Sequence, residues 1–184
     1  MAGARDPELA ASGISVEVSP ALAANVPDVL AADGFVLGTP VNIGYMSGAL
    51  KHFFDQVYYP CLGARAGAPY GLYVHGDNNT AGAVRAVQSI ATGLGWAEVV
   101  NPVAVAGPVG KDVERQCYEL GATVAANLAL TGVGPPFRVR SRCAPRRRAP
   151  AGIRRLTVSM GCWVTACAPR RPGQAGPGRQ EGQT

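Results

Sequence analysis

The chain has 184 residues, the size of one domain, and its formal net charge of +5 combines two oppositely charged parts. Residues 1–137 hold 6 Lys and Arg against 11 Asp and Glu, whereas residues 138–184 hold 11 Arg and one acidic residue. The start lacks the apolar core of a signal peptide, no apolar run reaches the roughly 20 residues of a membrane span, and the five cysteines form no C-x-x-C pair. We therefore expect a soluble, cytoplasmic protein with reduced thiols, no metal site and no membrane contact.

The opening of the chain predicts a short strand followed by a buried one. Residues 6–9 could begin or end a helix but are too few to form one, and residues 14–18 alternate as a half-buried outer strand that ends at Pro20. A short helical piece is expected at 28–32. Residues 35–37 then form an apolar run, closed by Gly38, that suits a parallel strand buried on both faces.

A well-patterned helix follows that strand after a loop of eight residues. Ser47 can cap its first amides, and Pro60 is expected to stop it. One apolar stripe follows the helical repeat: Leu50, Phe53, Phe54, Val57 and Tyr58. On the opposite, solvated side, Lys51 and Asp55 are predicted to form an i, i+4 ion pair.

Strand and helix continue to alternate up to residue 130. The pattern predicts a strand at 70–74, a helix ending near Leu94, a strand within 96–105 that Pro102 interrupts, and a helix over 110–130. Such alternation is typical of an α/β fold with a parallel sheet and helices on both faces. Four strands are predicted in all.

Two loops of the predicted sheet are candidates for a binding site. Residues 39–44 follow the buried strand, and residues 75–78 follow the next strand. Both leave carboxyl ends of strands, where open α/β sheets bind their ligands. No acid and base pair, nucleophile triad or G-x-G-x-x-G run is found, so we assign no catalytic residue.

The first loop carries a resemblance to a known family. Gly38-Thr39-Pro40, Gly44, Met46-Ser47-Gly48, Phe54 and Asp55-Gln56 resemble the matching run of flavodoxin-like flavoproteins, above all WrbA-type quinone reductases and NADPH-dependent FMN reductases. The resemblance covers about residues 1–130. It implies a flavodoxin-like three-layer sandwich whose first loop lies along the isoalloxazine ring of FMN and whose second loop also contacts the flavin.

The resemblance also implies a set of cofactor-binding residues and a reaction. The residues are Thr39, Pro40, Val41, Asn42, Ile43, Gly44, His75, Gly76, Asp77 and Asn78. From the residues alone, His75 is as well explained as a strand-end histidine, and Asn42 and Asn78 either bond the flavin or serve turn geometry. The implied reaction passes hydride from NAD(P)H through FMN N5 to a quinone or flavin acceptor. Self-association is expected from the resemblance. A flavodoxin-type electron carrier and a cofactor-free scaffold are the alternatives.

The beginning of the chain departs from the family pattern. Flavodoxin-like proteins open with a central strand and a Ser/Thr/Gly-rich turn before a helix that holds the FMN phosphate, and neither is found before residue 14. Loss of a central strand costs about 10 kcal/mol, comparable to the stability of a domain, about 5 to 15 kcal/mol. We expect this polypeptide to bind FMN weakly or not at all, and reductase activity to require the missing opening.

The end of the chain differs in composition from the rest. We divide it into a truncated flavodoxin-like domain, 1–134, and a disordered tail, 135–184, because from Arg138 onward 28 of 47 residues are Arg, Gly, Pro or Ala. The longest strand-like run there is Leu156-Thr157-Val158. Arginine runs could attract nucleic acid. We favour the alternative that this lysine-free segment is GC-rich DNA translated out of frame.

Overall fold

The computed structural model describes residues 2–130 and 154–160. Its elements are η1 (Gly3–Arg5), α1 (Pro7–Ala11), β1 (Ile14–Pro20), α2 (Val26–Ala31), β2 (Gly34–Asn42), β3 (Tyr45–Met46), α3 (Gly48–Cys61), β4 (Pro69–Gly76), α4 (Ala81–Leu94), β5 (Ala97–Glu98), β6 (Val103–Ala106), α5 (Lys111–Leu130) and β7 (Arg154–Met160).

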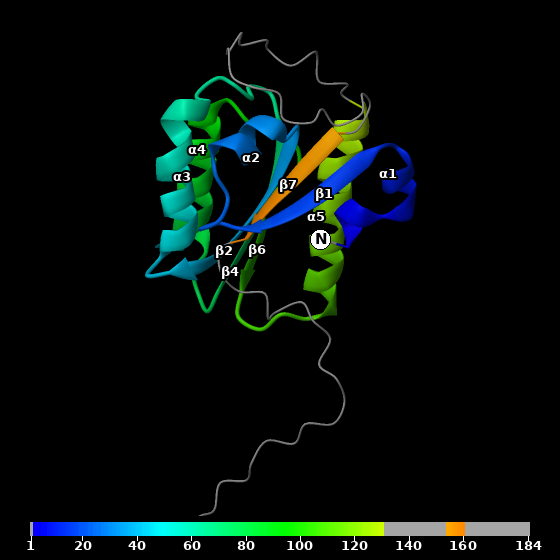
Figure 1. Cartoon of the computed structure of the whole chain (residues 1–184). Helices are drawn as coiled ribbons and strands as arrows, with labels where there is room; N and C mark the ends of the chain where they lie inside the picture. The colour runs from blue at the N-terminus through cyan, green and yellow to red at the C-terminus, as the bar shows by residue number, and fades with distance from the viewer. Residues whose placement is uncertain (1, 131–153, 161–184) are drawn as a thin grey trace, which may run out of the picture.

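The strands form one sheet between two layers of helices. Its order is β1-β7-β2-β4-β5, with β6 also paired to β4 and β3 paired to β2. Every pairing is parallel except that of β2 with β3. Helices α2, α3 and α4 cover one face, and α5 with α1 covers the other (Figure 1). The predicted flavodoxin-like sandwich is confirmed.

Two apolar cores lie on the two faces of the sheet. On one face the predicted α3 stripe is buried at Leu50, Phe53, Phe54 and Val57. In the same core the Trp96 ring stacks on Phe35 with 3.9 Å between ring centroids. The opposite core lies between α5 and the other face of the sheet. Helix α5 contributes Leu120, Val124, Ala125 and Leu128, and the strands contribute Ile14, Val36 and Leu156. Burial on both faces explains why β2 and β4 carry continuous apolar runs.

Three element boundaries differ from the sequence prediction. Residues 7–11 do form a helix, because the Asp6 carboxylate caps it by accepting the Glu8 N–H at 2.9 Å. Helix α3 ends at Cys61, one residue beyond Pro60, so the proline lies inside its last turn. The strand expected within 96–105 is two strands, β5 and β6, on either side of Pro102.

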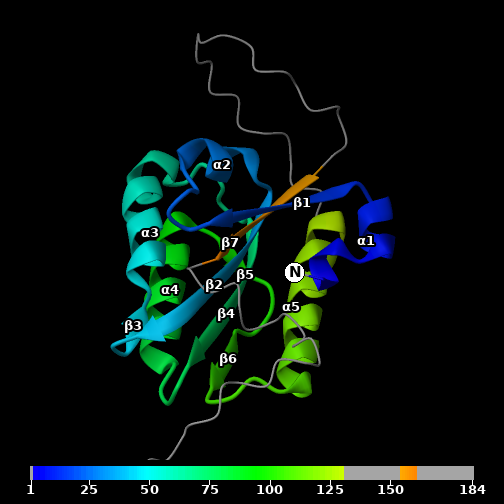
Figure 2. The same cartoon turned by 60° about the horizontal axis from the view of Figure 1, so that its bottom comes forward.

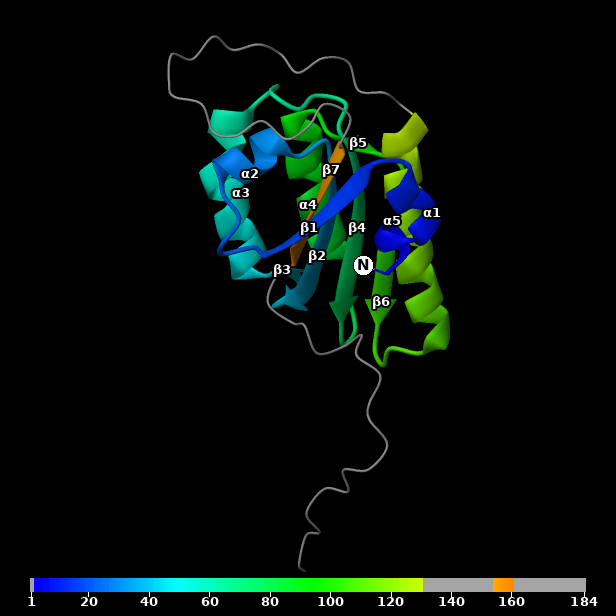
Figure 3. The same ribbon diagram turned by 45° about the vertical axis from the view of Figure 1, so that its right-hand side comes forward.

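The largest correction concerns β7, which comes from the segment predicted to be a tail without regular structure. Residues 154–160 pair in parallel with β1 along the whole strand and with residues 34–38 of β2. They occupy the central position that the sequence analysis left empty (Figure 3). That prediction is wrong for this stretch because pairing on both sides supports a strand that its own sequence pattern barely signals. The rest of 135–184 lies outside the described residues.

The described part of the chain offers no candidate for a membrane span, since none of its helices combines the necessary length with the necessary apolarity.

Candidate functional site

The two loops singled out from the sequence meet at the carboxyl edge of the sheet. Pro40 on β2 is the register partner of His75 on β4. Figure 2 shows the β2–β3 hairpin and the ends of β4 and β6 at this edge, beside the first turn of α4. The parallel register therefore places residues 39–44 and 75–78 side by side.

Most of the first loop is a tight β-hairpin, which the sequence analysis missed. Strand β2 continues to Asn42, which pairs with Tyr45 across the two-residue turn Ile43-Gly44. Both turn residues have positive φ, 53° for Ile43 and 73° for Gly44, as two-residue hairpin turns of the I′ type require. Glycine tolerates this region, but a β-branched residue there is a conformational outlier. The Ile43 side chain is fully exposed, at 105 %.

Buried hydroxyls hold the base of this hairpin. The Thr39 hydroxyl is buried, donates to the Pro40 carbonyl at 2.9 Å and accepts the Ser47 N–H at 2.9 Å. The Ser47 hydroxyl accepts the Leu50 N–H at 3.3 Å, which confirms its predicted role as the cap of α3. The hydroxyl of Thr39, a residue predicted to contact the cofactor, is thus hydrogen-bonded within the protein.

Two close backbone approaches fix the hairpin against neighbouring elements. A Cβ built on Gly82, in the first turn of α4, would lie 2.1 Å from the Gly44 carbonyl oxygen. A Cβ on Gly76 would lie 2.8 Å from the Cβ of Val41. Only glycine permits these contacts, since real Cβ atoms do not approach so closely. The tip of the hairpin therefore rests on α4, and its base rests on the end of β4.

The second loop is tied to the end of β6. The His75 Nε2 lies 2.8 Å from the Gly107 carbonyl oxygen, and because a carbonyl only accepts, Nε2 must carry the proton. The Gly107 N–H donates to the Gly76 carbonyl at 2.8 Å. The half-buried His75 thus binds β4 to the chain after β6, which supports the strand-end interpretation of this histidine.

The predicted site residues fall into two groups by exposure. Asn42, Ile43, Gly44, Asp77 and Asn78 are exposed at the carboxyl edge. The remaining five, 39–41, 75 and 76, are buried or half-buried and hold the edge together. The exposed group presents amide and carboxylate side chains beside an apolar one, a combination that can bond the polar edge of a flat ring while covering its face.

Two supporting residues were missed in the sequence analysis. Gly82 supports the hairpin, and the small residues Ala81-Gly82-Ala83 were its only sequence signal. The Asn79 side chain accepts the Ala81 N–H at 3.0 Å and so fills a free amide position at the start of α4. An asparagine just before a predicted helix is a recognisable capping signal.

Comparison with known proteins now identifies the family. The family model described as NADPH-dependent FMN reductase matches residues 6–109, more than half of the chain. This chain belongs to the NADPH-dependent FMN reductase family. Its flavin-associated oxidoreductase character is thereby shown at the level of the family. No curated protein matched the chain.

Solved structures agree on the fold. The chain is similar to a flavodoxin of Pseudomonas aeruginosa, solved as a cysteine-to-serine mutant, with 22 % identity, TM-score 0.56, and coverage of 71 % of this chain and 88 % of that one. It is similar to a WrbA-like flavodoxin protein of Agrobacterium tumefaciens, with 19 % identity, TM-score 0.50, and coverage of 55 % and 69 %. A Streptococcus flavodoxin gives 17 % identity, TM-score 0.50, and coverage of 68 % and 87 %.

The open surface of the hairpin is compatible with the ring of FMN, whereas the position implied for the phosphate lies outside the described residues. Built Cβ atoms on Gly44 and Gly48 meet no atom within 4 Å, so the surface of the hairpin is open to a flat ligand. The phosphate position implied by the resemblance is the turn after the central strand. Here that strand is β7, which ends at Met160, and the residues after it lie outside the described ones. Within the described residues, no group of three His, Cys, Asp or Glu could hold a metal.

Proposed function

Because β7 occupies the central position that the sequence analysis expected to be empty, we propose that this chain is itself an FMN-dependent NAD(P)H oxidoreductase. In this proposal the flavin ring binds at the carboxyl edge, between the β2–β3 hairpin and residues 75–78. The observation that carries the proposal is the hairpin itself. It holds an exposed, backbone-strained Ile43 and an open Gly44 at the edge where this fold binds ligands. Strain of this kind persists where the surrounding structure imposes it and is concentrated at ligand sites.

In this proposal the protein positions the ring and excludes water from one of its faces. Asn42 and Asn78 bond the polar edge of the ring, and Ile43 covers an apolar part. Thr39 and Ser47 keep the hairpin closed, and His75 fixes the end of β4. When bound, FMN supplies the hydride chemistry between NAD(P)H and an acceptor, which we propose to be a quinone or a second flavin.

The proposal is tested by binding and turnover measured together. Riboflavin and FMN are titrated into the full chain and followed by flavin fluorescence, and NAD(P)H oxidation is followed by its absorbance with a quinone or free flavin as acceptor. Asn42→Ala and Asn78→Ala should each weaken riboflavin binding about threefold to tenfold, the value of one hydrogen bond of about 0.5–1.5 kcal/mol. Asn101→Ala is the control, since Asn101 is exposed at the amino end of β6.

The outcomes separate the competing functions. Binding without NAD(P)H oxidation by a flavin-loaded chain favours a flavodoxin-type electron carrier. No binding of either flavin at millimolar concentration favours a cofactor-free scaffold. Equal effects of the Asn42, Asn78 and Asn101 substitutions on binding would place the flavin elsewhere and contradict the proposed site.

A further inference from the structure

Strand β1 forms one edge of the sheet, and no strand of the described residues pairs with its outer side. On its inner side it pairs with β7 along the whole of Ile14–Pro20, in a register without interruption, so it contains no bulge. An edge of this kind presents a row of unpaired N–H and C=O groups, which can act as a template for another strand.

The opposite edge of the sheet is protected against such pairing. There β5 has two residues and β6 has four, and Pro102 lies between them. Short edge strands and prolines are among the features by which proteins block edge-to-edge association. Strand β1 has seven residues, and its only charged side chain belongs to Glu17. Of the two edges, β1 is therefore the one that is open to pairing.

The hydrogen bonds to β7 determine which backbone groups of β1 point outward. The Arg154 N–H donates to the Gly13 carbonyl at 2.9 Å, and Arg154 is the register partner of Ile14. In a parallel ladder a residue bonds the residues before and after its partner, so the odd-numbered residues of β1 face β7 and the even-numbered ones face outward. The outward N–H and C=O groups are those of Ile14, Val16 and Val18. Pro20 ends the row because it has no N–H.

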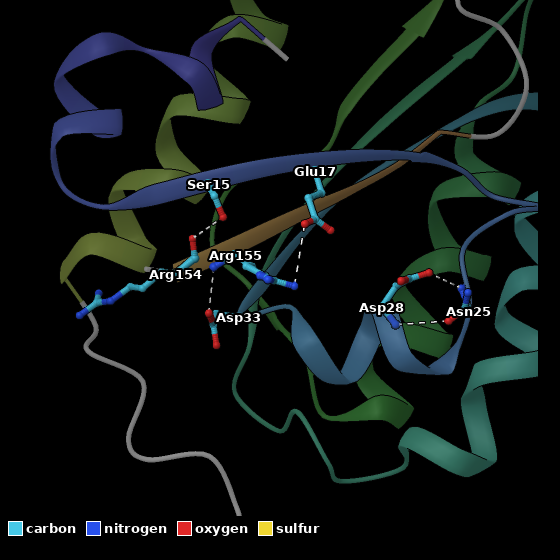
Figure 4. A network of polar contacts seen from close by, with 7 residues as sticks. All are labelled: Ser15, Glu17, Asn25, Asp28, Asp33, Arg154 and Arg155. Carbon is cyan, nitrogen blue, oxygen red and sulfur yellow. Dashed lines mark hydrogen bonds and ion pairs between the residues drawn. The ribbon is translucent and has the colours of Figure 1, made fainter. Parts of the chain in front are cut away.

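Two polar side chains of β1 contact β7 rather than extending along the open edge. The Ser15 hydroxyl donates to the Arg154 carbonyl at 3.2 Å, and the Glu17 carboxylate lies 3.9 Å from the Arg155 guanidinium (Figure 4). The Glu17 charge is thus partly balanced within one copy of the chain, which lowers the cost of bringing another strand to this edge.

The side chains of the outward residues form an apolar strip on the α5 side of the sheet. Ile14 is buried in the core of α5, and Val16 packs against the same core. Val18, next in the strip, is 41 % exposed. A strand that paired with the edge would cover Val18 and bond the outward backbone groups at the same time.

A second copy of this chain fits the edge in an antiparallel register centred on Val16. With Val16 opposite Val16 of the second copy about a two-fold axis, Ile14 lies opposite Val18 and Val18 opposite Ile14. All three outward residues then exchange both of their hydrogen bonds, about six bonds in all. The exposed Val18 gains a β-branched neighbour across the interface, and such pairs stabilise antiparallel strands.

Neighbouring registers fit less well. The register centred on Val16 places Glu17 opposite Ser15 of the second copy. If the axis moves to Glu17, the two Glu17 carboxylates come directly opposite each other, and Ile14 meets Pro20, which has no N–H to donate. If the axis moves to Ser15, Val18 meets residue 12, which lies outside the strand. Charge and backbone pairing therefore favour the same register.

We propose that the outer edge of β1 is an interaction surface for a second copy of this chain, and that two copies pair through antiparallel β1 strands centred on Val16. The pairing forms one continuous sheet through both copies. Because the strands are antiparallel, the carboxyl edges of the two sheets point in opposite directions. The interface is therefore separate from the flavin site proposed above and does not depend on flavin binding.

The first experiment combines sedimentation with amide hydrogen exchange on the full chain. At about 1 mM the chain should sediment as a dimer. In the dimer the Val16 and Val18 amides should exchange at least about tenfold more slowly than in the monomer, obtained by dilution or by Val18→Lys. The Ser15 and Glu17 amides face β7 and should exchange alike in both states. A monomer at 1 mM, or a dimer in which the Val16 and Val18 amides are no better protected, overturns the proposal.

A matched pair of lysine substitutions tests the edge without altering the core. Val18 and Leu30 are similarly exposed, at 41 % and 43 %, and Leu30 lies on α2. Val18→Lys puts an ammonium group opposite Ile14 of the second copy and should weaken the dimer at least about tenfold. Leu30→Lys should leave the dissociation constant unchanged, and both variants should keep the circular dichroism of the natural chain. Equal effects of the two substitutions on the dimer contradict the proposed surface.

The register is tested by cross-linking across the two-fold axis. In the proposed register the Cα atoms of the two Val16 residues lie about 5.5 Å apart, within reach of a disulfide, whereas those of the two Val18 residues lie more than about 12 Å apart. Under mild oxidation Val16→Cys should yield the peptide containing position 16 linked to itself, as detected by mass spectrometry, and Val18→Cys should yield no such link. A link in Val18→Cys, or none in Val16→Cys, contradicts the register.

Discussion

Replacing Ile43 by asparagine should raise stability and lower flavin affinity at the same time. Ile43 has φ 53°, a left-handed conformation that costs an ordinary residue about 1–2 kcal/mol. Asparagine is among the residues best tolerated there, and it loses no buried contact because the isoleucine side chain is 105 % exposed. The free energy of unfolding should therefore rise by about 1 kcal/mol, which raises Tm by about 3 °C for a domain of this size.

The affinity change has the opposite sign because the exposed side chain is proposed to cover part of the ring. Fully burying an isoleucine side chain is worth about 1.5–3 kcal/mol, and partial coverage gives a loss of up to about tenfold in riboflavin affinity. Thermal unfolding and fluorescence titration of the same samples measure both effects.

The matched control is Ile43→Val, which keeps a β-branched residue at the same φ. It should leave Tm unchanged and reduce affinity only slightly. A lower Tm for Ile43→Asn, or equal riboflavin affinity in all three proteins, would refute the reasoning that links strain at this turn to a ligand.

Two other predictions concern packing and pH. Gly82→Ala should force the hairpin away from α4, because its Cβ would lie 2.1 Å from the Gly44 carbonyl oxygen. We expect it to lower the free energy of unfolding by about 1–3 kcal/mol in chemical denaturation and to cause a clear loss of riboflavin binding. In the control, Gly110→Ala, the added Cβ meets no atom within 4 Å, so binding should be unchanged. If Gly82→Ala behaves like Gly110→Ala, the hairpin does not depend on this contact. Burial, and then the Glu98 carboxylate, raise the pKa of Tyr70 above its usual 10, so the folded state favours the protonated phenol. Its contribution to stability is present below about pH 10 and declines above it. Tyr70→Phe should therefore flatten the fall of Tm between about pH 10 and 12, and an unchanged fall would exclude Tyr70 as its cause.

Much of the α/β framework was predictable because its signals are local. The apolar run at 35–37 and the stripe of α3 each follow one periodicity, and burial on the expected face confirms both. The candidate loop at 39–44 could be singled out for the same reason, since strand, glycine-bracketed turn and helix succeed one another directly.

The hairpin was not predictable from turn chemistry. Two-residue turns of this type favour Asn-Gly or Asp-Gly, and Ile43 is a poor residue for the first position. Contacts distant in the sequence impose the turn, through Gly82 on α4 and the bond between Thr39 and Ser47. The local sequence pattern gives no sign of these distant contacts.

Strand β7 is the clearest case of tertiary context overriding local signal. Only Leu156-Thr157-Val158 suggests a strand, and arginines precede it. Its position is specified by Asp33, by the end of α5 and by two flanking strands.

The central claim, that the carboxyl edge binds a flavin ring, is tested most directly by amide chemical shifts of the full ¹⁵N-labelled chain. Riboflavin, which has the ring without the phosphate, and FMN are titrated to millimolar concentration. We predict shifts confined to residues 39–46 and 75–80, similar for the two ligands. Shifts confined to another face, or none with either flavin, would contradict the account.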